Sequence, residues 1–288
     1  MANVNYKELK KGGFMRQKQN NYFAMRLKCV GGHFTASQLA TIQKVAEEYG
    51  KGYIHLTSRQ GIEIPFIHLD SVEEVKRVLK EGGVEVGVCG PRVRTITACQ
   101  GNQICPSGLI DTAKLAKEFD KRYGGRELPH KFKFGFTGCH NNCLKAEEND
   151  MGVKGGVSPT WNAEKCIYCG VCQAVCPTKA ITLDKKAKTL EIDRDKCIYC
   201  GKCIKSCPAA LSGESGFIVS FGGLYGNRIA IGKNVLPIIF KEDKLYEIVE
   251  AALKYFEDNA KPGERFRNML DRLGWEDFQA TLKALDVA

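Results

Sequence analysis

The stretch GFTGCHNNC, residues 135–143, carries two cysteines with three residues between them. Cys139 and Cys143 follow an alternating, strand-like run, KFKFGF at 131–136, and a Thr-Gly pair. Zinc sites most often pair their cysteines as C-x2-C or C-x4-C, so the C-x3-C spacing indicates a different ligand. Two cysteines alone rarely complete a metal centre, and the remaining ligands must come from elsewhere in the chain.

A second pair, Cys99 and Cys105, is spaced C-x5-C and also follows a strand-like run, RTITA at 94–98. Each pair precedes a segment with helix-like periodicity, at 107–119 and at 141–149. Four cysteines placed at the ends of two strands can converge on one iron–sulfur cluster. The candidate ligand set is Cys99, Cys105, Cys139 and Cys143.

Eight further cysteines form two copies of one motif, CIYCGVCQAVCP at 166–177 and CIYCGKCIKSCP at 197–208. The spacing C-x2-C-x2-C-x3-C-P is that of bacterial two-cluster ferredoxins, in which the fourth cysteine of each copy ligates the other cluster. A pair of zinc sites is the alternative, because thiolates also bind zinc. Between the copies, AITLDKKAKTLEID at 180–193 predicts two short strands around a charged turn. The predicted [4Fe-4S] ligand sets are Cys166, Cys169, Cys172 with Cys207, and Cys197, Cys200, Cys203 with Cys176.

Composition narrows the class of protein. The chain has 288 residues, 43% of them hydrophobic, which is typical of a globular protein. No apolar run reaches the ~18 residues that span a bilayer, and the polar N-terminal stretch lacks a signal-peptide core, so we expect a cytoplasmic protein without membrane insertion. Fourteen cysteines then indicate metal or cluster binding rather than disulfides. Cys29 and Cys89 have no partner at a ligand spacing and are expected to be small buried side chains.

The formal net charge of +10 is compatible with nucleic-acid binding. We nevertheless expect no nucleic-acid partner, because thiolate-bound clusters are anionic and lower the charge of the loaded protein. Basic residues instead recur at alternate positions of three strand-like runs, and period two places each pair on one strand face. The pairs are Arg26 with Lys28, Arg92 with Arg94, and Lys131 with Lys133. A solvated strand face is the alternative for any one pair. Opposite the two lysines we expect a buried face made of Phe132, Phe134 and Phe136.

The C-x5-C and C-x3-C motifs, with Thr-Gly before the second, resemble those of the sirohaem sulfite and nitrite reductases. The resemblance implies that the four cysteines hold a [4Fe-4S] cluster, with Cys143 also bridging to the sirohaem iron. It implies that the substrate anion is bound by Arg26, Arg94, Lys131 and Lys133. Arg92 competes with Arg94 for the second arginine position, because the local spacing differs from the family's. A non-catalytic electron-transfer or sirohaem-binding subunit is the alternative, and it predicts loss of these cations.

Two further stretches resemble cofactor-binding strands of the family. LTSRQGIEI at 56–64 implies sirohaem contacts from Arg59 and Gln60. SFGGLYGNRIAIG at 220–232 resembles the glycine-rich strand and turn after the cluster, and implies contacts from Asn227 and Arg228. An ordinary glycine-rich hairpin is the alternative for this second stretch.

The predicted fold is α+β, a single-copy sirohaem reductase unit with an inserted two-cluster ferredoxin domain. Residues 1–80 form a ferredoxin-like α+β sandwich, 81–158 and 214–288 the sirohaem and [4Fe-4S] domain, and 159–213 the insert. Strands are expected at 216–223 and 227–232, and helices over 241–260 and 263–285. Full-length members of the family carry two copies of this unit, with the active site between them. A single copy therefore implies a homodimer or a heteromeric complex.

The resemblance is closest to the catalytic subunit of anaerobic or dissimilatory-type sulfite reductases. It implies six-electron reduction of sulfite to sulfide, with sirohaem and three [4Fe-4S] clusters as cofactors. Reduction of nitrite to ammonia uses the same cofactors and is the main alternative. No G-x-G-x-x-G follows a predicted strand, so the chain has no nicotinamide motif and needs an electron-donor protein or subunit.

Overall fold

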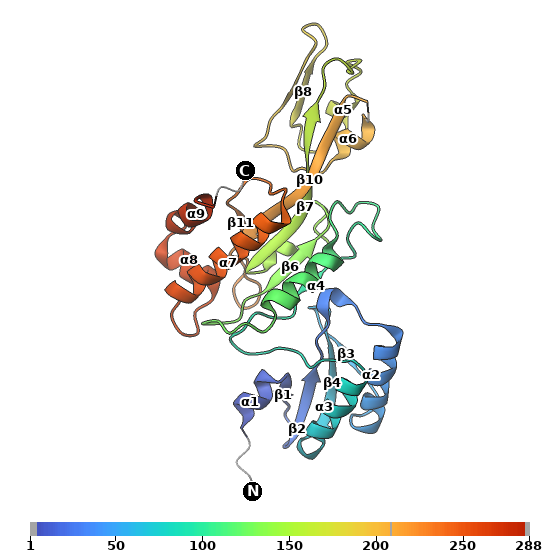
Figure 1. Ribbon diagram of the computed structural model, residues 1–288, viewed down its shortest axis with the longest axis vertical. Coiled ribbons are helices and arrows are strands. Elements are labelled where there is room, and N and C mark those ends of the chain that lie inside the picture. Colours follow the sequence, from blue (N-terminus) through green and yellow to red (C-terminus); the bar gives the residue numbers. More distant parts are fainter. Residues whose placement is uncertain (1–4, 208, 286–288) are drawn as a thin grey trace.

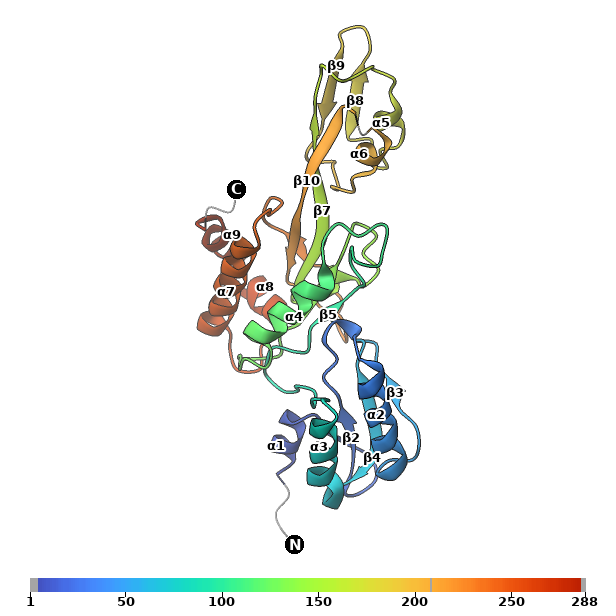
Figure 2. The same ribbon diagram turned by 45° about the vertical axis from the view of Figure 1, so that its right-hand side comes forward.

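The computed structural model describes residues 5–207 and 209–285, so the outermost residues of the first and last predicted units lie outside it. Three parts follow one another along the long axis of the molecule (Figures 1 and 2). The N-terminal part lies at one end, a five-stranded sheet with its helices lies in the middle, and the cysteine-rich segment lies at the other end. None of the helices in these described residues is both long and apolar enough to cross a membrane.

The N-terminal part is an antiparallel sheet of four strands in the order β1-β2-β4-β3, with helices packed on it. Alternate residues of the two inner strands are buried beneath the second and third helices, as a half-buried strand requires. After residue 22 the chain runs strand, helix, strand, strand, helix, which agrees with the α+β sandwich expected for this part. The elements are α1 (Tyr6–Lys11), β1 (Phe14–Arg16), β2 (Tyr22–Arg26), η1 (Val30–Gly32), α2 (Ala36–Glu48), β3 (His55–Leu56), β4 (Ile62–His68), η2 (Leu69–Ser71) and α3 (Val72–Glu81).

The middle sheet has the order β11-β10-β7-β6-β5, in which β5, β6 and β7 are parallel and β10 is antiparallel to its neighbours. Its strands are β5 (Thr97–Ala98), β6 (Phe134–Thr137), β7 (Met151–Trp161), β10 (Leu211–Phe221) and β11 (Lys233–Asn234). Helices pack on it, namely α4 (Thr112–Tyr123), α7 (Glu242–Asn259), α8 (Phe266–Leu273) and α9 (Glu276–Lys283).

The predicted phenylalanine face is confirmed. Phe132, Phe134 and Phe136 are fully buried. Phe119 of α4 stacks edge-on against Phe136 at 4.7 Å between ring centroids, and Phe256 of α7 lies 5.9 Å from Phe132. Aromatic pairs of this kind bury large apolar areas and fix the helices on the sheet. Lys131 and Lys133 alternate with these phenylalanines along residues 131–136 and therefore lie on the opposite face.

Strands β7 and β10 pair along their whole length and extend beyond the sheet to the cysteine-rich segment (Figure 1). That segment contains α5 (Val171–Ala174), β8 (Ile181–Asp184), β9 (Thr189–Ile192) and α6 (Lys202–Ser206). The predicted strand pair around a charged turn is confirmed as β8 and β9. Its small core includes Cys172 and Cys203 beside aliphatic side chains. Both long strands run through the predicted boundaries at 159 and 213.

Three local predictions are wrong. Residues 141–149 form no helix beyond the single turn η3 (Ala146–Glu148), because Asn142 and Lys145 adopt left-handed backbone conformations. Residues 227–232 form no strand, and their strand-type pairing is limited to an isolated bridge between Leu224 and Ala230. The predicted helix over 263–285 is two helices, separated at Gly274, whose φ of 92° a helix interior does not accommodate.

Candidate active site

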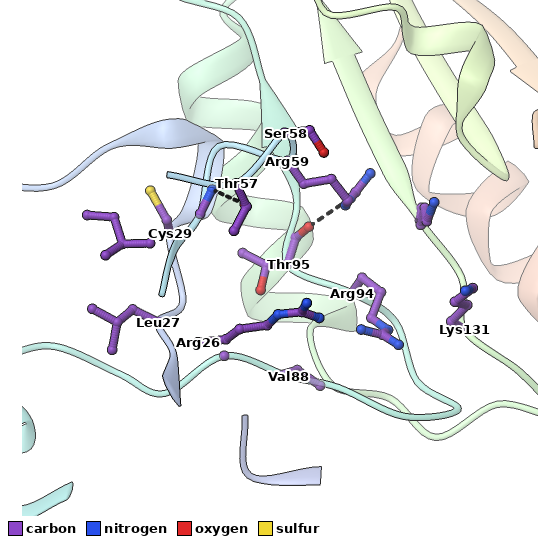
Figure 3. Close-up of a pocket in the computed structure, with 14 residues that line it drawn as sticks. Arg26, Leu27, Cys29, Thr57, Ser58, Arg59, Val88, Arg94, Thr95 and Lys131 are labelled. Atoms are coloured by element: carbon purple, nitrogen blue, oxygen red, sulfur yellow. Dashed lines mark hydrogen bonds between the residues drawn. The ribbon is translucent and has the colours of Figure 1, made fainter. Parts of the chain in front are cut away.

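A cavity of about 290 Å³ lies where the N-terminal part meets the middle sheet (Figure 3). Figure 3 shows the side chains of Arg26 and Arg94 extending toward the same space. The segments that line the cavity come from β2, the β3–β4 turn, the chain before β5 and the chain before β6. Five basic residues singled out in the sequence lie in its wall, namely Arg26, Arg59, Arg94, Lys131 and Lys133.

The two lysines enter the cavity from the run that leads into β6. The backbone N–H of Lys133 donates to Asp150 Oδ2 at 2.9 Å, which fixes the start of the strand. Burial lowers the pKa of Lys133 to about 8, and the positive charges of Arg59 and other neighbours add to the fall. Burial likewise lowers the pKa of Lys131. The Lys133 ammonium can therefore hold an anion and also release a proton near neutral pH.

Arg94 and Arg92 have different surroundings. Arg94 lines the cavity, burial lowers its pKa, and its Nε has no hydrogen-bond partner among the described residues. Arg92 instead pairs with Glu127, with 2.6 Å between Nη2 and Oε1. The prediction that both arginines share one strand face is wrong, because Arg92 and Val93 form only isolated bridges and residues 94–96 belong to no strand. The placement favours Arg94 as the anion-binding arginine.

Arg26 reaches the cavity from the end of β2. Its Nε donates to Glu63 Oε1 at 2.5 Å, and its Nη1 contacts Cys89 Sγ at 3.7 Å. Cys89 is buried, as predicted, but it lies between Arg26 and Arg94, which the sequence did not indicate. Cys29 also lines the cavity, and burial raises its pKa to about 11.

Arg59 and Gln60 tie the N-terminal part to the cysteine-bearing strands. Arg59 Nη1 donates to Asn149 Oδ1 at 2.8 Å, and burial lowers the pKa of its guanidinium to about 10. The Gln60 side chain forms two bonds with the backbone of Ala98, donating at 2.8 Å and accepting at 3.0 Å. Because Ala98 directly precedes Cys99, this amide fixes the first predicted cluster ligand. The cofactor contacts expected of both residues stay predictions.

We expect Gln60→Ala to lower the free energy of unfolding by about 1–3 kcal/mol, because it leaves both backbone groups of Ala98 unpaired in a partly buried place. Urea unfolding followed by circular dichroism measures the change. Gln43→Ala is the matched control, because the Gln43 amide bonds only to exposed Glu47 on α2. Equal midpoints for the two variants would show that Gln60 does not hold the strand.

The first four candidate cluster ligands lie in one group. Cys99 Sγ accepts a hydrogen bond from the Gly138 N–H at 3.0 Å, which joins the two motifs. Gly138 also permits this close approach, because a Cβ there would lie 3.1 Å from Gly101 Cα. Burial raises the pKa of Cys139, and the nearby thiols of Cys105, Cys143 and Cys99 add to the rise. Cys139 is buried whereas Cys143 is exposed, so one ligand of the group faces outward.

Among the eight remaining candidate ligands, two thiols lie near cysteines of the other copy of the motif. Burial raises the pKa of Cys172, and its thiol neighbours Cys207, Cys166 and Cys169 contribute. Burial also raises the pKa of Cys197, whose thiol neighbours are Cys200 and Cys176. Cys207 and Cys176 thus each lie beside the other copy of the motif.

Within residues 5–207 and 209–285, no three His, Cys, Asp or Glu side chains lie close enough to bind one metal ion. A four-iron cluster lies between its thiolates and separates them more than a single ion does. The fit of the three cysteine groups to clusters therefore rests on their grouping and spacing along the chain.

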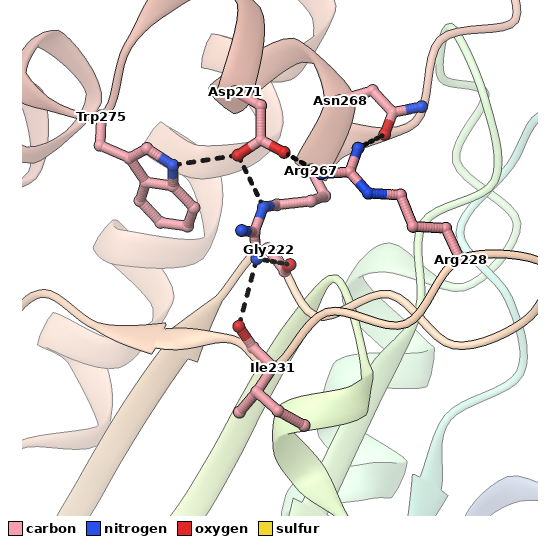
Figure 4. A network of polar contacts seen from close by, with 7 residues as sticks. All are labelled: Gly222, Arg228, Ile231, Arg267, Asn268, Asp271 and Trp275. Carbon is pink, nitrogen blue, oxygen red and sulfur yellow. Dashed lines mark hydrogen bonds and ion pairs between the residues drawn. The ribbon is translucent and has the colours of Figure 1, made fainter.

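Asn227 and Arg228 do not line the cavity. Arg228 Nη2 pairs with Asp271 Oδ2 at 2.8 Å, and its Nη1 donates to Asn268 at 3.2 Å, so the side chain anchors the loop to α8 (Figure 4). Asn227 is exposed on the same loop. The loop lies over η3, because the Gly232 N–H donates to the Glu147 carbonyl. Cofactor contacts from this loop stay a prediction.

Two charged residues at the site were missed by sequence reasoning. Asp150 and Arg265 form an ion pair with 3.0 Å between Oδ1 and Nη2, and their side chains are 0% and 12% exposed. Neither lies at a motif spacing, and 115 residues separate them. Neither the alternation of basic residues along a strand nor the spacing of cysteines could therefore predict these two residues.

Comparison with known protein families places the chain. Residues 89–286 match the family described as "Nitrite and sulphite reductase 4Fe-4S domain", and residues 15–82 match the "Nitrite/Sulfite reductase ferredoxin-like half domain". Fold and site thus define a protein in which an iron–sulfur domain follows a ferredoxin-like half domain. The chain belongs to the nitrite and sulfite reductase family.

Individual relatives agree with this assignment. The chain is 34% identical to the coenzyme F420-dependent sulfite reductase of Methanocaldococcus jannaschii over 95% of its own length and 44% of that protein's. It is 32% identical to an uncharacterised protein of the same organism over 99% and 97% of the two lengths. The crystal structure of dissimilatory sulfite reductase I superposes with a TM-score of 0.73 at 22% identity, covering 91% of this chain and 69% of that one, which shows a shared fold. The chain thus spans less than half of the first relative.

Proposed function

We propose that this chain is the catalytic, sirohaem-carrying subunit of a sulfite reductase that reduces sulfite to sulfide with six electrons. The observation that carries the proposal is the convergence of five basic side chains from four separate segments on one cavity. Cations brought together in this way repel one another, and a bound anion offsets that cost. The four-cysteine group that begins at Cys99, directly after the Ala98 backbone held by Gln60, would deliver electrons to the cavity.

The cations have distinct roles in the proposal. Sulfite is an oxyanion, and guanidinium groups bind oxyanions with paired hydrogen bonds. Arg94 and Arg26 would therefore orient the anion. Lys131 and Lys133 would stabilise the negative charge that develops on departing oxygen atoms and supply protons to them. The pKa of about 8 for Lys133 keeps most of its ammonium protonated at pH 7 while making the proton available.

The residues present fit the two coupled cofactors of the proposal. Sirohaem carries carboxylates, and the cavity offers partly buried guanidinium groups, among them Arg59 and Arg94. The exposed Cys143 would bridge to the sirohaem iron, and the other three cysteines of its group would complete the [4Fe-4S] ligand set. When bound, the pair would supply an open iron position and single electrons.

The contacts of the cysteine-rich segment, proposed as an inserted ferredoxin domain at 159–213, suggest an order for its two clusters. Lys205, within the second motif, donates to the carbonyl of Pro106 at 3.1 Å, and Pro106 directly follows Cys105. Val157 of β7 donates to the carbonyl of Tyr199 at 2.9 Å within the second motif. Helix α5 of the first motif lies farther from the middle sheet than α6 of the second motif (Figure 1), and Cys169 of the first motif is exposed. Electrons would enter near Cys169 and leave through the cluster of the second motif.

The remaining parts of the proposal concern partners and place. The chain would be cytoplasmic and take electrons from a donor protein or subunit. A homodimer or a heteromeric complex would complete the site, because one copy of the half domain is present. Several large apolar side chains are exposed and suit such an interface, namely Leu56, Ile104, Ile229 and Ile231.

Turnover by anoxically purified protein with reduced methyl viologen tests the proposal. Sulfite and nitrite are offered separately, and sulfide and ammonia are quantified. Sulfide formed at six electrons per product supports the sulfite reductase. Faster ammonia formation would make the chain a nitrite reductase, and neither product from protein that holds all its cofactors would indicate an electron-transfer subunit.

A further inference from the structure

Asp150 lies at the junction of the elements that build the anion cavity. Its carboxylate accepts from the Lys133 N–H at 2.9 Å and from Arg265 Nη2 at 3.0 and 3.1 Å. Its backbone carbonyl accepts from the Gly222 N–H at 2.8 Å. One residue thus joins the start of β6, the end of β10 and the start of α8. Breaking a contact of this kind affects all three elements at once.

Arg265 brings the C-terminal helices into the same charge cluster. Its side chain is 12% exposed, and its Nε is buried without a hydrogen-bond partner among the described residues. Its charge lowers the pKa values of Arg59, Arg94, Lys131 and Lys133, after the larger effect of burial on each. Arg265 therefore faces the cavity cations although it was not among the predicted site residues.

Asp150 opposes this accumulation of positive charge. Its side chain is fully buried, and its charge raises the pKa values of Arg59, Lys131 and Lys133 against the effect of burial. Glu63 already pairs with Arg26 at the far side of the cavity. Burial raises the pKa of Asp150, whereas the charge of Arg265 and its hydrogen bonds to the carboxylate lower that pKa. The pair with Arg265 therefore favours the charged form of a carboxylate that would be costly to bury without a cation.

We propose that Asp150 and Arg265 form a positioning pair that holds Lys133 in the anion cavity and sets its charge state. The proposal rests on the anion-binding role proposed for the cavity. The carboxylate fixes the backbone of Lys133 by a direct hydrogen bond, and Arg265 fixes the carboxylate. The charged groups that act on the Lys133 ammonium are Arg59, Asp150, Arg265 and Lys131.

A purely structural ion pair and a positioning pair give different results when its members are replaced singly. Loss of either member of a structural pair only destabilises the fold. In a positioning pair, Asp150→Asn removes a negative charge and makes Lys133 lose its proton at lower pH. Arg265→Gln removes a positive charge and makes Lys133 keep its proton to higher pH. If both substitutions only destabilised the fold, they would not shift the pH at which Lys133 loses its proton in opposite directions.

Competitive labelling of the loaded protein with trace acetic anhydride reads the titration of Lys133 without turnover. Only the neutral amine reacts, so the acetylation of the Lys133 peptide, measured by mass spectrometry across pH, gives a midpoint. We expect the midpoint in the unmodified protein to lie below that of an exposed lysine, because burial lowers the pKa of Lys133. In Asp150→Asn it falls by about one pH unit, in Arg265→Gln it rises, and in Arg265→Lys it stays in place. The alkaline limb of the pH profile for kcat/KM moves with it.

Arg272→Gln is the matched control, because it breaks another ion pair of α8, with Glu264 at 2.8 Å. That variant leaves the Lys133 midpoint unchanged. The proposal is overturned if Asp150→Asn leaves the midpoint in place or raises it, or, should that variant fail to fold, if Arg265→Gln does not raise it. A shifted midpoint in a protein that turns over neither sulfite nor nitrite would leave the positioning pair standing and reject the proposed function.

Discussion

Replacing Arg94 with glutamine is expected to lower kcat/KM for sulfite by about 100-fold, the size of effect seen when a preorganised donor to a developing anion is removed. Arg94 lines the cavity, its Nε has no partner in the described chain, and burial lowers the pKa of its guanidinium. A cation kept partly buried without a carboxylate of its own is available to a bound anion. Because that anion binds before it reacts, we expect the loss in both KM and kcat.

Arg92→Gln provides the matched control two residues away. It removes an ion pair with Glu127, whose side chain is 74% exposed, so the expected cost in stability is below about 1 kcal/mol. Steady-state kinetics with reduced methyl viologen compares the two variants at several sulfite concentrations. A large loss in Arg92→Gln with little change in Arg94→Gln would reverse the assignment of the anion-binding arginine.

The two arginines also show where periodicity arguments hold. In the run 131–136 the alternation is real, because the chain leads into a strand with helices on one side, and Phe132 and Phe134 take the buried face. Lys131 and Lys133 then line the cavity as predicted. The residue types at 92–94 alternate equally well, but the backbone there forms only isolated bridges. Arg92 pairs with Glu127, whereas Arg94 lines the cavity. Periodicity predicts a face only where a strand exists.

Other parts of the site depend on information that local sequence does not contain. The spacing of cysteines within a motif is a local property of the sequence, so the cysteine sets can be predicted without knowing the fold. The Asp150–Arg265 pair is set by tertiary packing across 115 residues. The failed helix at 141–149 has a similar origin. Asn142 takes a left-handed conformation and its side chain accepts from the Ala146 N–H at 2.8 Å, an alternative to helix that propensity cannot foresee.

The crossed ligand sets of the cysteine-rich segment give the second large expected effect. Cys207→Ala is expected to lose one cluster, about four iron atoms per chain, and to slow reduction by a protein donor. The loss follows because Cys207 is a neighbour of Cys172 in the first motif, although it belongs to the second. Cys29→Ala is the control, because Cys29 lies in none of the three cysteine groups. We expect this variant to retain all its iron.

Double variants decide which cluster Cys207 serves. If it completes the first-motif cluster, Cys169→Ala/Cys207→Ala loses no more iron than Cys207→Ala, because both changes strike one cluster. Cys200→Ala/Cys207→Ala then loses about twice as much iron as Cys207→Ala, because each change removes a ligand from a different cluster. Iron analysis and electron paramagnetic resonance of the reduced protein measure the difference. If Cys169→Ala/Cys207→Ala instead loses twice as much iron as Cys200→Ala/Cys207→Ala, each motif binds its own cluster. That result would reject the predicted exchange of the fourth cysteine between the two motifs.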